Sequence, residues 1–223
     1  MSETIDQADR VRLRNRTEAG RVLARALSDY AGRDDVVVLA LPRGGVPVAY
    51  EVAKELGAPL DAFLVRKLGV PGHEELAMGA VASGGVLVLD EAVLRWLGIS
   101  EEQIEETLAR ELQELRRQEA AYRDGRPPPE LKGKTVIIVD DGLATGATMR
   151  AAAHAVRRHG PARIVIAVPV ASRETCDQLR DEVDEVVCAI TPAPFSAVGN
   201  WYEDFSQTSD EEVGELLARA DAE

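Results

Sequence analysis

Two adjacent carboxylates, Asp140 and Asp141, follow directly after the apolar run VIIV at 136–139. A run of this kind is typical of a strand that is covered on both faces. In open α/β sheets, ligands bind beyond the carboxyl ends of such strands. Because neighbouring carboxylates repel each other, the pair indicates a ligand that offsets the repulsion. Carboxylates accept hydrogen bonds from a pair of hydroxyls, such as a ribose diol, and also help to hold a divalent cation.

A loop of small and hydroxyl-bearing residues, GLATGAT at 142–148, separates the acids from an alanine-rich segment with helical character. Gly142 and Gly146 allow the backbone to approach a ligand closely. The N–H groups at the start of a helix near Thr148 suit a phosphate, and Thr145 adds a second hydroxyl. The stretch therefore offers a phosphate site beside a diol site, and a phosphorylated sugar satisfies both.

Other loops that join a strand to a helix fit this stretch less well. A P-loop needs a lysine before its Ser or Thr, whereas the run here is TGAT. A dinucleotide-binding loop needs GxGxxG, which is missing from the stretch. A receiver domain also has acids after a strand, but it gives the TGAT run no role. The remaining structural alternative is a plain strand–turn–helix with two exposed acids.

The stretch VIIVDDGLATGAT resembles the binding motif of the type I phosphoribosyltransferases for phosphoribosyl pyrophosphate (PRPP), with Gly142 in place of the usual aliphatic residue. The resemblance covers roughly residues 17–190 and is supported by PRGG at 42–45 and by the pair Arg66-Lys67. It implies an α/β fold: a Rossmann-like parallel sheet flanked by helices, with a mobile lid, a helical insertion and a C-terminal, hood-like extension.

The resemblance assigns the two ends of PRPP to different residues. Asp140 and Asp141 would bind the ribose hydroxyls, and Mg²⁺ would be held mainly by PRPP, with these two acids as candidate protein ligands. The 5′-phosphate would be wrapped by Ala144, Thr145, Gly146, Ala147 and Thr148. The pyrophosphate would lie against Arg43, Gly44, Gly45, Arg66 and Lys67, in a region where the family often has a non-proline cis peptide. Arg43, Lys67 and Asp141 are the candidate catalytic residues.

The activity implied by the resemblance is that of a glycosyltransferase of the pentosyltransferase class, acting in nucleotide salvage. It would transfer 5-phosphoribosyl from PRPP to a small nitrogenous base and release pyrophosphate. Family members that use 6-oxopurines often carry an acid at the position of Ala144, so an adenine or pyrimidine acceptor is favoured here. Two alternatives stay open: a non-catalytic PRPP-sensing or binding protein, and a phosphosugar or phosphate-ester hydrolase.

The elements that position these residues are expected in one domain, 1–223. Apolar runs predict strands at 36–41, 61–68, 86–89, 162–170 and 185–190. Between them we expect a lid at 69–85, with a short strand at 77–82, and a helical insertion at 90–125 opened by a capping box at Ser100 and Gln103. In the extension 191–223, Phe195, Trp201 and Tyr202 are candidates for stacking on the base, with packing in the core as the alternative.

Composition limits the partners. The 223 residues carry a formal net charge of −13, which argues against nucleic acid as a partner. No apolar run is long enough to cross a bilayer, and the polar N-terminus has no signal core, so a cytoplasmic protein is expected. Cys176 and Cys188 are expected to be reduced packing residues, and a transition-metal site is not expected. The resemblance and the long charged helix favour a homodimer.

Overall fold

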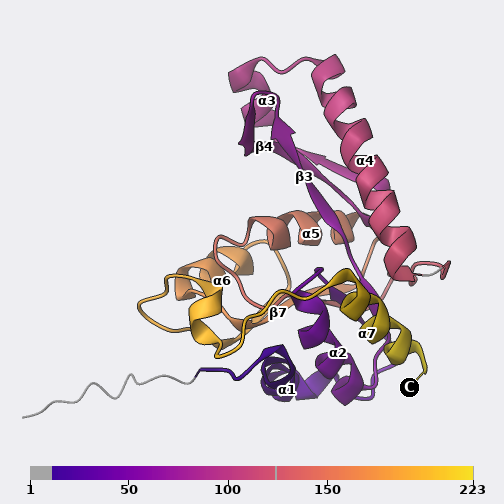
Figure 1. The fold of residues 1–223 in the computed structure, drawn as a ribbon, viewed down its shortest axis with the longest axis vertical. Coiled ribbons are helices and arrows are strands. Elements are labelled where there is room, and N and C mark those ends of the chain that lie inside the picture. Colours follow the sequence, from indigo (N-terminus) through magenta and orange to yellow (C-terminus); the bar gives the residue numbers. More distant parts are fainter. Residues whose placement is uncertain (1–11, 124, 223) are drawn as a thin grey trace, which may run out of the picture.

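The computed structural model describes residues 12–123 and 125–222, so most of the polar N-terminus lies outside the described residues. Five parallel strands form the main sheet in the order β2-β1-β6-β7-β8 (Figure 1). Their bounds in chain order are Val36–Ala40 for β1, Leu60–Ala62 for β2, Thr135–Val139 for β6, Arg163–Val170 for β7 and Glu185–Ile190 for β8. The expected α/β fold with a helix-flanked parallel sheet is confirmed.

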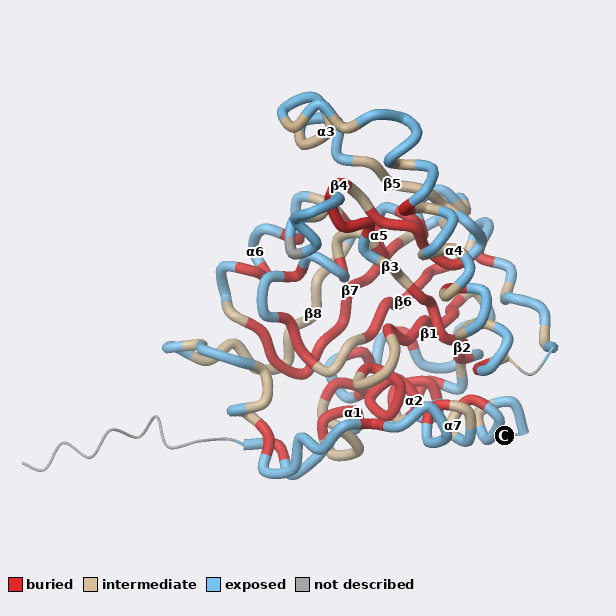
Figure 2. The backbone as a smooth tube through the Cα atoms, turned by 45° about the horizontal axis from the view of Figure 1, so that its top comes forward, coloured by how far each residue is buried: buried red, intermediate tan, exposed pale blue. Residues whose placement is uncertain are grey.

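Helices cover both faces of this sheet, so alternate strand residues enter two cores. In β1, Val36 and Val38 pack with α1 (Arg16–Ala26), α2 (Gly45–Leu56) and α7 (Asp210–Ala222). Val37 and Leu39 pack with α5 (Ala147–Arg158) and α6 (Arg173–Arg180) on the other face. The central strands are buried along their whole length (Figure 2). This double burial explains why they appear in the sequence as continuous apolar runs.

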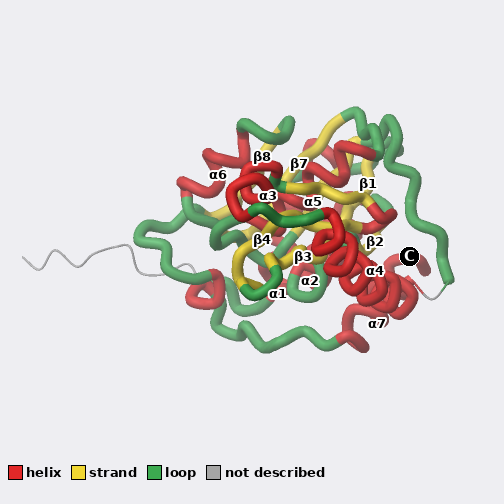
Figure 3. Tube along the Cα trace, turned by 90° about the horizontal axis from the view of Figure 1, so that it is seen from above, coloured by secondary structure: helices red, strands yellow, loops and turns green. Residues whose placement is uncertain are grey.

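Residues 65–123 form a separate projection, here called the arm. Its antiparallel sheet consists of β3 (Val65–Val70), β4 (His73–Ala82) and β5 (Val86–Leu89). Two helices follow, α3 (Glu91–Leu97) and α4 (Glu101–Arg123). Viewed from above, α3 and β4 lie over α5, and α4 runs outward to α7 (Figure 3). Short 3-10 turns lie at Ser28–Tyr30, Ser83–Gly85 and Val198–Trp201.

Two predictions in this region were wrong. The single strand expected at 61–68 is split, because Ala62 pairs with β1 in the main sheet whereas Val65 pairs with Ala82 in the arm. The loop expected before residue 77 is largely a hairpin, in which β3 reaches Val70 and β4 already begins at His73. The pairing of β3 with β4 shifts register at Gly69. Because the segment is rich in small residues, its sequence did not reveal this irregular hairpin.

The helical insertion is fixed to the body at its far end. The capping box at the start of α4 is confirmed, because the Gln103 N–H donates to Ser100 Oγ at 3.3 Å and the Ser100 N–H donates to Gln103 Oε1 at 3.0 Å. At the end of α4, Arg123 pairs with Asp61 of β2 at 2.9 Å. In the part of the chain that the structure describes, no helix is long and apolar enough to cross a membrane.

The expectation of two reduced cysteines was wrong, because Cys176 and Cys188 are joined in a disulfide. Cys176 lies on α6 and Cys188 on β8, and these two elements pack against each other. The pairing depends on this packing and not on a spacing pattern. It fastens α6 to the edge strand of the main sheet.

Candidate functional site

Two loops meet at the carboxyl edge of the main sheet, where β1 and β6 lie side by side. The segment after β1 passes through a cis peptide between Pro42 and Arg43 and enters α2 at Gly45, as the resemblance implied. The segment after β6 carries Asp140 and Asp141 and enters α5 at Ala147. The N-termini of α2 and α5 therefore both open at the edge that holds the acids, and helix N-termini attract anions.

Gly44 makes the contact between these two loops. A Cβ atom on Gly44 would lie 2.0 Å from Asp141 Oδ2 and 2.8 Å from Asp141 Cγ. The backbone of Gly44 is ordinary, with φ −61° and ψ −29°, so any residue type could adopt it. Glycine is therefore required at this position by the close approach of the carboxylate and not by the backbone conformation.

The acidic pair is partly buried and internally hydrogen-bonded. The Asp141 N–H donates to Asp140 Oδ1 at 2.8 Å. Burial, together with the neighbouring charge of Asp141, raises the pKa of Asp140 well above its usual range. Burial also raises the pKa of Asp141, but Arg16 opposes this rise. Arg16 places Nη2 at 2.8 Å and Nε at 2.9 Å from Asp141 Oδ2.

In the loop expected to hold a phosphate, Gly146 is buried and the other four residues, Ala144, Thr145, Ala147 and Thr148, are exposed. Gly146 precedes α5 in the left-handed region, with φ 71°, while Thr145 and Thr148 are exposed. The Ala144 carbonyl accepts a hydrogen bond from Thr175 Oγ1 at 2.8 Å. Thr175 lies beside Cys176 on α6, so the disulfide-linked helix supports the back of this loop.

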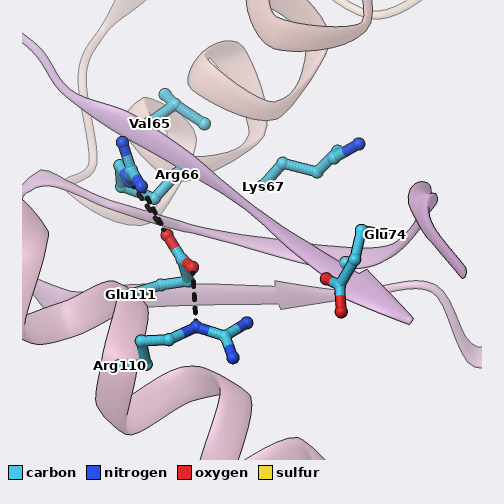
Figure 4. A pocket seen from close by; sticks show the side chains of 7 residues that line it. Val65, Arg66, Lys67, Glu74, Arg110 and Glu111 are labelled. Carbon is cyan, nitrogen blue, oxygen red and sulfur yellow. Dashed lines mark hydrogen bonds and ion pairs between the residues drawn. The ribbon is translucent and has the colours of Figure 1, made fainter. Parts of the chain in front are cut away.

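Of the expected pyrophosphate residues, the three basic ones, Arg43, Arg66 and Lys67, line two neighbouring cavities. Arg43 and Arg66 line one of about 350 Å³, together with Tyr122 of α4 and Asp210 of α7. The second, of about 320 Å³, lies within the arm and is lined by Arg66 and Lys67 together with other arm residues (Figure 4). The structure thus brings the basic residues that follow β1 and those of β3 to one region.

The arm holds Arg66 in place through an acid of α4. Glu111 Oε2 accepts from Arg66 Nη2 at 2.7 Å and from Arg66 Nε at 3.0 Å (Figure 4). Glu111 Oε1 accepts from Arg110 Nε at 3.3 Å. The helical insertion, whose role was open from the sequence, therefore supplies a counter-charge at the cavity.

The C-terminal extension lies against the backbone of the acids. Tyr202 is 3% exposed, and its hydroxyl donates to the Asp141 carbonyl at 2.6 Å, so its ring has little surface left for a base. Phe195 and Trp201 are partly buried and pack against the core. Phe205 is 38% exposed, and its ring lies 4.1 Å from the Arg16 guanidinium.

The extension also explains the glycine that departs from the motif. A Cβ atom on Gly142 would lie 2.5 Å from Val198 Cγ1 and 2.9 Å from the Val170 carbonyl oxygen. Val198 thus occupies the space beside Gly142 that a side chain at this position would need. The usual aliphatic side chain would displace the extension.

Sequence reasoning missed Arg16 and Glu111, although both contact predicted site residues. Arg16 lies 125 positions from Asp141, and Glu111 lies 45 positions from Arg66. Each belongs to a helix with many other charged residues, so nothing in its local pattern distinguishes it. For Phe205 a signal existed, because it belongs to the aromatic cluster of the extension.

Known proteins resemble the chain over most of its length. The family model described as "Phosphoribosyl transferase domain" matches residues 12–201. The "Putative phosphoribosyl transferase Rv0571c" of Mycobacterium tuberculosis (strain ATCC 25618 / H37Rv) is 48% identical over 206 residues, which are 92% of this chain and 46% of that protein. The "Bifunctional protein PyrR" of Chloroflexus aurantiacus is 36% identical over 129 residues, 56% of this chain and 65% of that protein.

A solved structure shares the fold closely. The crystal structure of TT1426 from Thermus thermophilus has 47% sequence identity and a TM-score of 0.83, covering 94% of this chain and 99% of that one. The chain spans about half the length of the Mycobacterium tuberculosis relative that it matches. The family match extends from Arg12 to Trp201 and includes both loops at the edge of the sheet. The chain therefore belongs to the phosphoribosyl transferase domain family.

Proposed function

We propose that the protein is a pentosyltransferase that transfers 5-phosphoribosyl from PRPP to a nitrogenous base and releases pyrophosphate. The observation that carries the proposal is the meeting of two helix N-termini on either side of an acidic pair. PRPP has two phosphate-bearing ends with a diol between them, so its charge pattern matches this arrangement.

In the proposed complex, the 5′-phosphate lies at the N-terminus of α5, where it accepts from the backbone of the 144–148 loop. The pyrophosphate lies beside the N-terminus of α2, near Arg43 and the cavity that Arg66 lines. Asp140 and Asp141 accept hydrogen bonds from the ribose hydroxyls. A bound cation or diol would also offset the burial and repulsion that raise the pKa of Asp140.

The residues present fit a magnesium ion that is held mainly by its substrate. Among the described residues, no group of three or more His, Cys, Asp or Glu side chains could hold a metal. Two carboxylates are nevertheless available, and Mg²⁺ in proteins commonly takes one or two carboxylates plus substrate phosphates. Asp140 is the better candidate, because Arg16 already occupies Asp141 Oδ2. When bound, the ion would neutralise charge on the pyrophosphate.

The reaction breaks the bond between ribose C1 and the pyrophosphate oxygen, and the electron pair leaves with pyrophosphate. A ring nitrogen of the base forms the new bond to C1, and the base loses a proton if it carried one there. Arg43 and Lys67 stabilise the charge that develops on the leaving group. The arm stands next to this region, and its approach to bound substrate would exclude water from the cation-like centre.

The acceptor is proposed from the loop and the extension together. Ala144 provides no acid to assist a 6-oxopurine, so adenine or a pyrimidine is favoured. Of the extension's aromatic rings, Phe205 has a larger exposed fraction than Tyr202. Phe195 and Trp201, which are partly buried, remain proposed contacts of the base. Phe205 is added to them as a third proposed contact. Nucleotide salvage and a homodimer stay predictions.

The first test supplies PRPP and Mg²⁺ with a panel of purine and pyrimidine bases and measures pyrophosphate. We expect release that depends on at least one base. Silence across the panel, with PRPP binding intact, would leave a PRPP-binding regulator as the better proposal. Pyrophosphate released without any base would favour a hydrolase.

The second test concerns the acids. Asp140→Asn combined with Asp141→Asn should abolish PRPP binding measured by calorimetry, because amide groups cannot replace the charged acceptors. Circular dichroism should show an unchanged fold. Unaltered PRPP affinity in the double variant would refute the site.

A further inference from the structure

The N-terminal segment and the C-terminal extension are paired through their backbones beside the acidic pair. The Leu13 N–H donates to the Trp201 carbonyl at 2.9 Å, and the Glu203 N–H donates to the Leu13 carbonyl at 2.8 Å. The Asp204 N–H donates to the Arg14 carbonyl at 2.9 Å. These bonds fix the entry of the chain into α1, whose first residue is Arg16.

Arg16 is held on three sides. Its Nη1 donates to the Ser206 carbonyl at 2.6 Å, and its guanidinium lies 4.1 Å from the centre of the Phe205 ring. The third contact is the ion pair with Asp141, in which the two side chains are only 12% and 15% exposed. An arginine with this many contacts has little freedom to move, so it presents a fixed charge.

The geometry of the ion pair leaves half of the carboxylate for a ligand. Nε and Nη2 of Arg16 both contact Oδ2 of Asp141, so neither of these contacts occupies Oδ1. Arg16 therefore fixes the orientation of the carboxylate through Oδ2, while Oδ1 can accept a hydrogen bond from a hydroxyl. Gly44 lies against the same Oδ2, and its missing side chain leaves the carboxylate the space that this orientation needs.

We propose that Arg16 is a positioning residue for the transfer site, which holds the Asp141 carboxylate by Oδ2 and turns its Oδ1 toward the ribose hydroxyls of PRPP. The proposal rests on the proposed function, because it takes PRPP as the ligand of the acids. It gives the C-terminal extension a task besides contact with the base: Phe205 and Ser206 hold the arginine that holds the acid.

The charged and titratable groups around Asp141 support this assignment. Asp140 precedes it and repels a second negative charge, and Tyr202 donates to its carbonyl from the extension. Burial raises the pKa of Asp141, and Arg16 is the cation that opposes this rise. Without Arg16, the carboxylate would lose the two contacts that fix Oδ2, so Oδ1 would no longer be held in one direction for a diol.

The first experiment compares crystal structures of the ligand-free protein and of its Arg16 variants. In Arg16→Gln, the Asp141 carboxylate should leave the orientation in which Oδ2 faces residue 16, and Arg16→Lys, which keeps a charge, should retain much of that orientation. Arg14→Gln is the matched control, because Arg14 is 74% exposed and pairs with Glu18 instead. An unchanged orientation of the Asp141 carboxylate in Arg16→Gln would overturn the proposal.

The second experiment measures PRPP binding by calorimetry at pH 7. In Arg16→Gln, we expect the affinity to fall roughly tenfold, as for loss of a charged hydrogen-bond partner, and Arg16→Lys should restore part of the affinity. Tighter binding by this variant would show that Arg16 blocks the site, and would also overturn the proposal. If Arg16→Gln does not fold, Arg16→Lys provides the same comparison with an intermediate expected shift.

The two experiments separate this proposal from the proposed function. If the unaltered protein does not bind PRPP, the proposed function fails, yet the crystal structures still decide whether Arg16 fixes the orientation of Asp141. If PRPP binds equally well to the unaltered protein and to Arg16→Gln, the site stands and the role of Arg16 is refuted.

Discussion

Replacing Gly44 by alanine would test the closest contact in the candidate site. The added methyl group would lie 2.0 Å from Asp141 Oδ2 and 3.1 Å from Arg16 Nε. Alanine can adopt the helical backbone angles of Gly44 without strain, so the contact itself is the only expected source of cost. The carboxylate must move, and in moving it breaks the pair with Arg16.

The expected loss of stability follows from the broken ion pair and from the overpacked methyl group. Hydrogen bonds to charged groups contribute about 1.5–3 kcal/mol, and an overpacked methyl group costs about 1–3 kcal/mol. Because relaxation relieves part of the overlap, we expect Gly44→Ala to lower the free energy of unfolding by about 2–3 kcal/mol. For a chain of this size, each kcal/mol corresponds to about 2–4 °C in Tm.

The assay combines thermal unfolding with PRPP calorimetry. Gly44→Ala should lower Tm and weaken PRPP binding at least tenfold, because the displaced carboxylate no longer faces the diol. Gly214→Ala in α7 is the matched control: apart from its chain neighbours and the backbone of its own helix, no described atom lies within 4 Å of the added methyl group, so this variant should be neutral or slightly stabilised.

A double-mutant comparison gives the result that would refute this reasoning. In an Asp141→Ala background the clash disappears, so Gly44→Ala should then cost much less than in the unaltered protein. An equal cost in both backgrounds would show that the contact with Asp141 is not the cause. Unchanged Tm and PRPP affinity in the single variant would refute the close approach itself.

Two further predictions concern stability. Because the pKa of Asp140 is raised on folding, its ionisation opposes folding, and this cost appears as pH rises through the folded-state pKa. Asp140→Asn should therefore be more stable than the unaltered protein at pH 7, by about 1–2 kcal/mol, with the gap closing toward pH 3 in urea unfolding; a gap that does not vary with pH would contradict this. Reducing the Cys176–Cys188 disulfide, which spans a sequence separation of 12, should cost about 2–4 kcal/mol. Dithiothreitol should lower the Tm of the unaltered protein accordingly, but it should not change the Tm of a Cys176→Ser, Cys188→Ser variant. If the thiols are shown to be freed and the Tm is the same with and without reductant, the predicted stabilisation by the disulfide is refuted.

The acidic pair illustrates why a binding site costs stability. Asp140 and Asp141 are both partly buried, side by side, and burial raises the pKa of each. A stable fold would favour neutral groups here. Asp141 is partly compensated by Arg16, whereas burial and the charge of Asp141 both oppose the ionisation of Asp140, so Asp140→Asn is expected to stabilise the protein while weakening its proposed activity.

Local chemistry determined much of the protein from its sequence. The runs at 36–40 and 135–139 are strands because continuous β-branched residues suit a sheet that is buried on both faces. The acids and the loop that follows them were placed at the strand end by adjacency alone. The capping box at Ser100 was visible for the same reason, since its partners lie three residues apart.

The tertiary structure decided what depends on contacts between distant segments. Arg16 reaches Asp141 because the extension pairs with the N-terminal segment, and position 142 needs a glycine because Val198 fills the space that a side chain would take. The disulfide forms because α6 packs on β8. Each of these partners looks ordinary in its own stretch of sequence. Its role depends on a position in space that only the packed core fixes.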